Sequence, residues 1–162
     1  MSERLPPAEI IGVGMVTPVG LYAAAAKAAI RAGLSRPRKE TFINKEGERQ
    51  AMRLVDEEYL EPLSPEISAS GLTGPHERML RLAGPALAEA ISTAGEPPPL
   101  FLALPERLPG TRDPIAPSFV RDLAIQARVK LDEKRSAVYR EGAGFLFALR
   151  DALHFLANGA GS

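Results

Sequence analysis

Residues 136–161 constrain the fold more than any other part of this chain. They begin with a short β-compatible run, pass through a glycine-rich turn at 140–144, and end in an apolar segment at 145–157. A helix drawn through that segment is apolar on nearly every side, which is typical of a helix in the interior of a fold. It is far shorter than the roughly 20 apolar residues of a membrane span. The sequence therefore predicts a strand, a tight turn and a buried helix.

The turn lies where many enzymes hold a nucleophile, because the unpaired N–H groups and the dipole at a helix N-terminus favour an anionic group. It reads Arg140-Glu141-Gly142-Ala143-Gly144 and contains no Cys, Ser or Thr. We interpret it as a degenerate nucleophile turn without a catalytic residue. Gly142 and Gly144 are expected to relieve strain or close backbone contact, so Gly142→Val should destabilise the fold by about 1–3 kcal/mol.

Composition narrows the function classes. The 162 residues suit a single domain spanning residues 1–162. Twenty basic residues balance 20 acidic residues, so we expect no nucleic-acid partner, and no segment predicts a membrane partner. The chain has no cysteine and only two histidines, which predicts neither a metal centre nor a cofactor and excludes thiol catalysis. The N-terminus lacks a signal-peptide pattern, so a cytoplasmic location is expected.

The rest of the chain alternates strands and helices. Residues 10–17 read as a buried strand whose Gly12 and Gly14 admit another backbone closely. A dinucleotide-binding motif there would need a third glycine, which is absent. The further expected elements are a helix at 21–32 closed by Gly33, a hairpin within 38–55, a helix at 77–94 containing Pro85 and stopped by Gly95, a strand at 100–104, a helix at 115–129 and a strand at 136–139. This order predicts an α/β fold with one mostly parallel mixed sheet and helices on both faces.

Three stretches carry a resemblance to a known family. The run Gly12-Val13-Gly14-Met15-Val16-Thr17-Pro18-Val19-Gly20 resembles the first strand and turn of β-ketoacyl synthases, which have the thiolase-like fold. Residues 81–95 look like that family's second helix, and the segment ending Leu156-Ala157-Asn158-Gly159 looks like its nucleophile helix. The chain matches only the N-terminal half of a family member.

The resemblance implies that the catalytic residues of the family are missing from this chain. Counting back from Gly159 places the family's catalytic cysteine at Gly142, with Glu141 beside it, and the family's catalytic histidines belong to the half that has no counterpart here. His154 matches neither and is interpreted as a histidine on the helix face. A condensing acyltransferase would need another nucleophile. Glu141 could supply a carboxylate and Arg140 could hold an anion, but such residues at an exposed turn usually stay solvated or pair with each other. We therefore predict that the chain is not an enzyme.

Two shorter stretches narrow the resemblance. Phe42-Ile43-Asn44-Lys45-Glu46-Gly47-Glu48-Arg49 and Pro99-Leu100-Phe101-Leu102-Ala103-Leu104-Pro105-Glu106 look like a divergent thiolase-like subgroup, whose genes lie beside effector, PAAR and chaperone genes of type VI secretion systems. This implies an adaptor that binds a protein client, in effector loading or as a co-chaperone. The alternative is a non-catalytic partner subunit of a β-ketoacyl-ACP synthase in fatty acid or polyketide synthesis, or a degenerate form of that enzyme.

An apolar helix of this kind needs cover on two sides. In the thiolase fold the second half of the protein supplies one layer, which this chain lacks. We therefore expect a protein partner or a second copy of the chain to cover the helix. The predicted interface residues are Phe145, Phe147, Leu149, Leu153 and Leu156.

Overall fold

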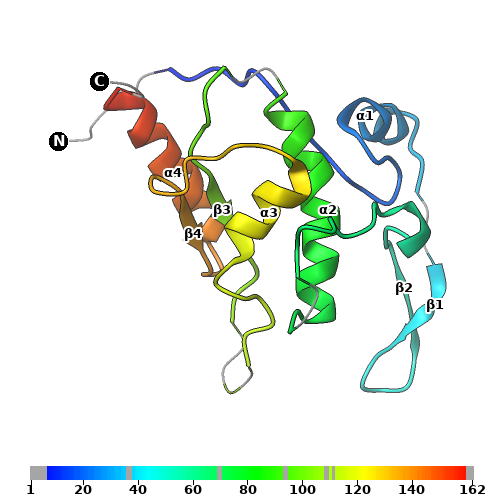
Figure 1. Cartoon of the computed structure of the whole chain (residues 1–162). Helices are drawn as coiled ribbons and strands as arrows, with labels where there is room; N and C mark the ends of the chain where they lie inside the picture. Colours follow the sequence, from blue (N-terminus) through cyan, green and yellow to red (C-terminus); the bar gives the residue numbers. More distant parts are fainter. Residues whose placement is uncertain are drawn as a thin grey trace.

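The computed structural model describes residues 7–35, 38–68, 71–92, 95–107, 110 and 112–159, so both ends of the predicted domain lie outside the described residues. Helices and strands alternate along this part of the chain, as the sequence predicts (Figure 1). The elements are α1 (Ala23–Arg31), β1 (Arg38–Ile43), β2 (Arg49–Met52), the 3₁₀ turn η1 (Glu57–Tyr59), α2 (Gly74–Ala90), β3 (Phe101–Ala103), α3 (Phe119–Ala127), β4 (Ala137–Tyr139) and α4 (Gly144–Ala157).

The strands form two separate small sheets. β1 and β2 make the predicted antiparallel hairpin, while β3 and β4 pair in parallel with Leu102 opposite Val138. The mixed α/β class is confirmed. The prediction of one mostly parallel sheet is wrong for the described residues, which contain two sheets of two strands each.

The parallel pair has helices on both faces (Figure 1). On one face α4 contacts β3 and β4, and the rings of Phe101 and Phe155 lie 5.9 Å apart. On the other face, Leu100 and Leu102 pack against the main core. Alternate residues of a strand point to opposite faces, which explains this division. The core joins α2, α3 and the loops around them through Ile67, Leu80, Leu104, Ile115, Phe119 and Leu123.

The predicted strand at 10–17 is not formed. The segment is extended, and among the described residues its only bridge joins Thr17 to Gly20. It packs along α2, where Gly12 and Gly14 lie against the backbone of α2 near its C-terminus. Ile10, Ile11 and Val13 stay exposed, so the segment lacks the burial on a sheet that would stabilise it as a strand. The predicted close backbone approach is nevertheless confirmed, and its partner is a helix.

The helix bounds follow local chemistry. α1 ends at Arg31 and is closed as predicted by Gly33, which has φ +65°, and the N–H of Leu34 donates to the carbonyl of Ala29 over 2.9 Å. α2 begins three residues earlier than predicted, because the Thr73 hydroxyl accepts the N–H of His76 and caps the helix. α3 begins later than predicted, after Pro117, since a residue that precedes proline disfavours helical geometry.

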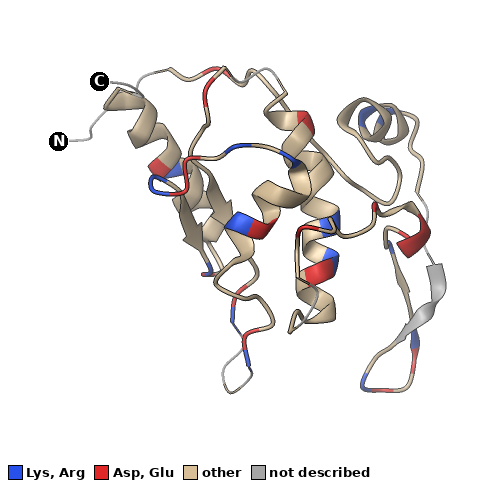
Figure 2. Ribbon diagram, in the orientation of Figure 1, with Lys and Arg blue, Asp and Glu red and all other residues tan. Residues whose placement is uncertain are grey.

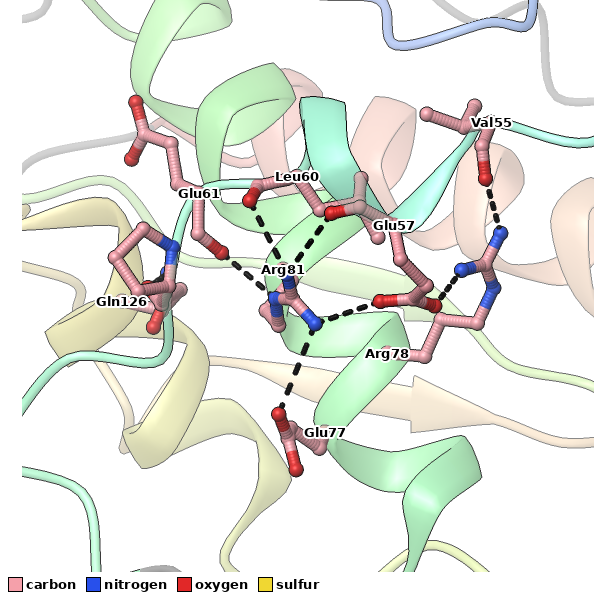
Figure 3. A network of polar contacts seen from close by, with 9 residues as sticks. Val55, Glu57, Leu60, Glu61, Glu77, Arg78, Arg81 and Gln126 are labelled. Carbon is pink, nitrogen blue, oxygen red and sulfur yellow. Dashed lines mark hydrogen bonds and ion pairs between the residues drawn. The ribbon is translucent and has the colours of Figure 1, made fainter.

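Arg81 ties the segment after the hairpin to α2 (Figure 3). Its side chain is largely buried and donates to the backbone carbonyls of Leu60 and Glu61 over 3.1 and 2.7 Å. It also pairs with the carboxylate of Glu57, which Arg78 contacts from the preceding turn of α2. Because one guanidinium satisfies several carbonyls, η1 and the loop beyond it stay against the helix.

Candidate functional site

Helix α4 lies at the edge of the described fold rather than in its interior (Figure 1). Only Gly144 and Ala148 are buried along it. Four large apolar side chains are exposed, with relative exposures of 68% for Phe145, 63% for Leu146, 46% for Leu149 and 53% for Leu156. The prediction of a buried C-terminal helix is therefore wrong for the described chain. The reason is that the parallel pair offers only one layer, and the opposite side of α4 has no cover.

The exposed side chains lie on one side of the helix. With about 100° between successive residues, Phe145, Leu146, Leu149, Leu153 and Leu156 fall within an arc of about 100°. We call these five residues the α4 stripe. Leu153 is half-buried. Phe147 lies off the stripe and is half-buried, with the Arg150 guanidinium 5.2 Å from its ring centre. Four of the five predicted interface residues thus share one side, and Leu146 joins them.

The inner side of α4 is anchored through polar contacts. Tyr139, the last residue of β4, donates its hydroxyl proton to Asp151 Oδ2 over 2.7 Å. The Arg150 Nε–H donates to the other carboxylate oxygen over 2.7 Å. These bonds, Arg150 first, lower the pKa of Asp151, while burial raises the pKa of Tyr139. The orientation of the α4 stripe is therefore fixed by its opposite side.

The turn before α4 differs in detail from the prediction. Arg140 neither pairs with Glu141 nor stays solvated; its two terminal nitrogens donate to the two oxygens of Asp113 over 2.6 and 2.7 Å. Glu141 is exposed. A Cβ on Gly142 would lie 3.7 Å from its nearest neighbour, an ordinary contact, and its φ is not left-handed. The prediction of strain at Gly142 is therefore wrong. Gly144 is the crowded glycine, because a Cβ built on it would lie 3.3 Å from the carbonyl oxygen of Tyr139.

A cleft of about 590 Å³ opens beside this turn. It lies at the carboxyl ends of β3 and β4, where ligands of parallel sheets usually bind. Its charged lining residues are Arg107, Arg112, Asp113 and Arg140. From the sequence alone, residues 111–114 read only as a turn. Nothing in the pattern places Asp113 beside Arg140 at the end of β4, because the two residues are 27 positions apart in the chain.

A buried polar group lies at the back of the cleft. His76 is fully buried, and its Nδ1 accepts the N–H of Ala116 over 3.0 Å, which places the ring proton on Nε2. That nitrogen lies 3.6 Å from Asp122 Oδ2, longer than a hydrogen bond. Burial lowers the pKa of His76, although the Asp122 carboxylate opposes the shift.

These residue types suggest a catalytic triad, but the geometry does not form one. The Ser118 hydroxyl donates to Asp122 over 2.6 Å rather than to the histidine. A nucleophilic serine needs the histidine as its base within hydrogen-bond reach. The group therefore fixes the N-terminus of α3 against α2 and does not activate an oxygen.

Among the described residues, no group of three or more His, Cys, Asp or Glu side chains is placed to hold a metal ion. None of the described helices has the length and apolar character to cross a bilayer. Comparison with protein-family models, with curated proteins and with solved structures finds no match to this chain. The thiolase-like resemblance accordingly stays a prediction.

Proposed function

We propose that this chain is a non-catalytic thiolase-like adaptor that binds a protein client through the α4 stripe. The observation that carries the proposal is the exposure of Phe145, Leu146, Leu149 and Leu156 on one side of the helix. Burying one such side chain fully is worth about 1.5–3 kcal/mol. Contiguous exposed apolar patches usually mark interaction sites. A partner with a complementary apolar face would therefore gain most of its affinity here.

The turn supports the non-catalytic part of the proposal. The chain has no cysteine to form an acyl-enzyme, and Gly142 takes the position that the resemblance gives to the nucleophile. Arg140 is held by Asp113 rather than directed at the turn. Incubation with malonyl- and acyl-carrier proteins should give neither a condensed product nor an acyl adduct by mass spectrometry. A covalent acyl group at any residue would overturn this part.

The resemblance supplies the class of client. We propose a cytoplasmic protein of a type VI secretion system, either an effector awaiting loading or its chaperone. The runner-up client is an active β-ketoacyl-ACP synthase subunit, because the corresponding helix of the thiolase fold packs against a homologous half. Without a client, we expect the α4 stripe to cause self-association of the purified chain.

The absence of cysteine provides a clean test, since one introduced thiol is a unique label. Leu149→Cys, carrying a benzophenone, should crosslink to a purified effector or chaperone encoded beside the gene. Tyr59→Cys is the matched control, because Tyr59 is similarly exposed, at 51% against 46%, but lies on η1. Leu149→Glu should abolish binding in calorimetry.

Light scattering completes the test. The unmodified chain should self-associate at high concentration, and the Leu146→Glu, Leu149→Glu variant should be monomeric. If the unmodified chain stays monomeric and binds neither type of client, the α4 stripe is not a docking surface and the proposal fails. Binding to the synthase subunit alone would replace the secretion client by the runner-up.

A further inference from the structure

The cleft at the end of the parallel pair has the position of a ligand site. β3 leads into the loop toward α3 on one face of the pair, and β4 leads directly into α4 on the other. Because the two connections diverge, a crevice forms outside the carboxyl ends of the strands. Described residues from 71–76, 104–107, 112–120 and 138–140 line it, and its volume of about 590 Å³ lies within the usual range for small-molecule sites.

The lining of the cleft carries excess positive charge. The cleft is lined by the guanidinium groups of Arg107, Arg112 and Arg140 and by one carboxylate, that of Asp113, so its lining holds three positive charges and one negative charge. His76 adds none in its neutral form. The loop between β3 and α3 carries most of these residues and shows adjoining basic and acidic segments in Figure 2. The cleft therefore favours an anion.

Asp113 is already saturated by the protein. It accepts two bonds from Arg140, contacts Arg107 Nε at 2.9 Å, and accepts the N–H of Ile115 at 2.9 Å. The Ile115 N–H contributes most to lowering the pKa of Asp113, and Arg140 and Arg107 add to the effect. The carboxylate is thus held as an anion that orients two guanidinium groups without cancelling the third.

Arg140 and Arg112 both have donors that no described protein group accepts. The Arg140 side chain is only 19% exposed, and its Nε–H is buried without an acceptor. Within the described residues, no ion pair or hydrogen bond of Arg112 is found, and this side chain is exposed at the mouth of the cleft. Buried polar groups in folded proteins are usually paired. An oxyanion in the cleft would accept from the free guanidinium of Arg112 and would lie beside the positive charge of Arg140, and guanidinium groups suit carboxylate and phosphate alike.

The remaining walls of the cleft are apolar and include Leu72, Leu104, Phe119, Val120 and Val138. We infer that the cleft binds a small organic anion, with a carboxylate or phosphate head held by Arg112 and Arg140 and an apolar body against these walls. This site does not rest on the proposed adaptor function, because its lining residues are separate from the α4 stripe.

Calorimetry on the full chain tests the inference with three probes that share a hexyl tail: heptanoate, hexyl phosphate and hexanol. At least one anion should bind with a Kd of about 1 mM or tighter, and hexanol at least tenfold more weakly. Binding should weaken as salt is added, since salt screens exposed charges. Preference between the two anions identifies the head group. Equal binding of hexanol would show an apolar pocket only and overturn the inference.

Variants locate the site. Arg112→Ala should weaken anion binding by about tenfold or more, and it should fold, because this side chain is exposed and makes no described contact. Arg31→Ala, on the exposed surface of α1, is the matched control and should bind like the unmodified chain. Arg140→Lys keeps the charge but removes the fork, and should also weaken binding. Failure of both anions to bind, or unchanged binding by Arg112→Ala and Arg140→Lys, would refute the site. The site would also be refuted if an aspartate-rich peptide bound to the chain and neither small anion did.

Discussion

Gly14→Ala is the sharpest test of how the N-terminal segment is held. A Cβ built on Gly14 would overlap the carbonyl oxygen of Ala86 and lie 2.7 Å from its carbon. It would also lie 2.9 Å from the nitrogen of Ala90. Real Cβ atoms do not approach backbone so closely, and a helix backbone cannot give way as a side chain can. The extended segment must therefore move away from α2.

That movement breaks a specific contact. The neighbouring N–H of Met15 donates to Glu89 Oε2 over 3.1 Å, and the same carboxylate accepts the N–H of Ala23 at the start of α1. Overpacking costs about 1–3 kcal/mol, and a hydrogen bond to a charged group about 1.5–3 kcal/mol. Because the segment can peel away and relieve part of the overlap, we expect a loss of about 2–4 kcal/mol in the free energy of unfolding.

Urea unfolding followed by circular dichroism measures this loss. Gly95→Ala is the matched control, because a Cβ there meets nothing within 4 Å and φ is not left-handed. Both substitutions restrict the unfolded chain equally, so their difference reports the folded contact. If Gly14→Ala unfolds within about 0.5 kcal/mol of the Gly95→Ala control, the segment does not pack on α2 as described.

Three further predictions test other contacts by urea unfolding. Arg81→Met should cost about 1.5–3 kcal/mol because it leaves carbonyls without their charged donor, and a loss near zero would mean that water replaces it. Gly144→Val should cost about 1–3 kcal/mol more than Gly142→Val, since only the former position is crowded, and equal losses would contradict that geometry. Burial lowers the pKa of His76 despite Asp122, so the unfolded state binds more protons and stability should fall as pH drops below about 6.5. A His76→Phe variant should lose that part of the slope, and an unchanged slope would exclude His76 as its source.

Local chemistry made several elements predictable from the sequence. The alanine-rich helix closed by Gly33, the hairpin and the strand before the 140–144 turn all depend on residues close together in the chain. So does the start of α4, which follows a glycine-rich turn. The close approach at Gly12 and Gly14 was also predictable, because only glycine lets a second backbone come so near.

Pairings between distant segments were not predictable in the same way. A run such as 10–17 is compatible with a strand, but whether it pairs depends on an open sheet edge beside it. Here α2 offers small residues, Ala86 and Ala90, and the segment lies along them instead. The ion pair between Asp113 and Arg140 likewise joins a proline-rich loop to the end of a strand. Charge and composition of either segment alone give no sign of it.

The burial of α4 failed as a prediction for a different physical reason. Hydrophobicity specifies that a surface should be removed from water, but not which molecule removes it. Tyr139 and Arg140 are adjacent at the end of β4 and make contacts on two different sides. Tyr139 holds the inner side of α4 through Asp151, and Arg140 lines the cleft and binds Asp113. One junction therefore lies between an apolar helix side, where we propose that a protein client binds, and a basic cleft, where we propose that a small anion binds. Because the two surfaces use different side chains of that junction, each proposal can fail without the other.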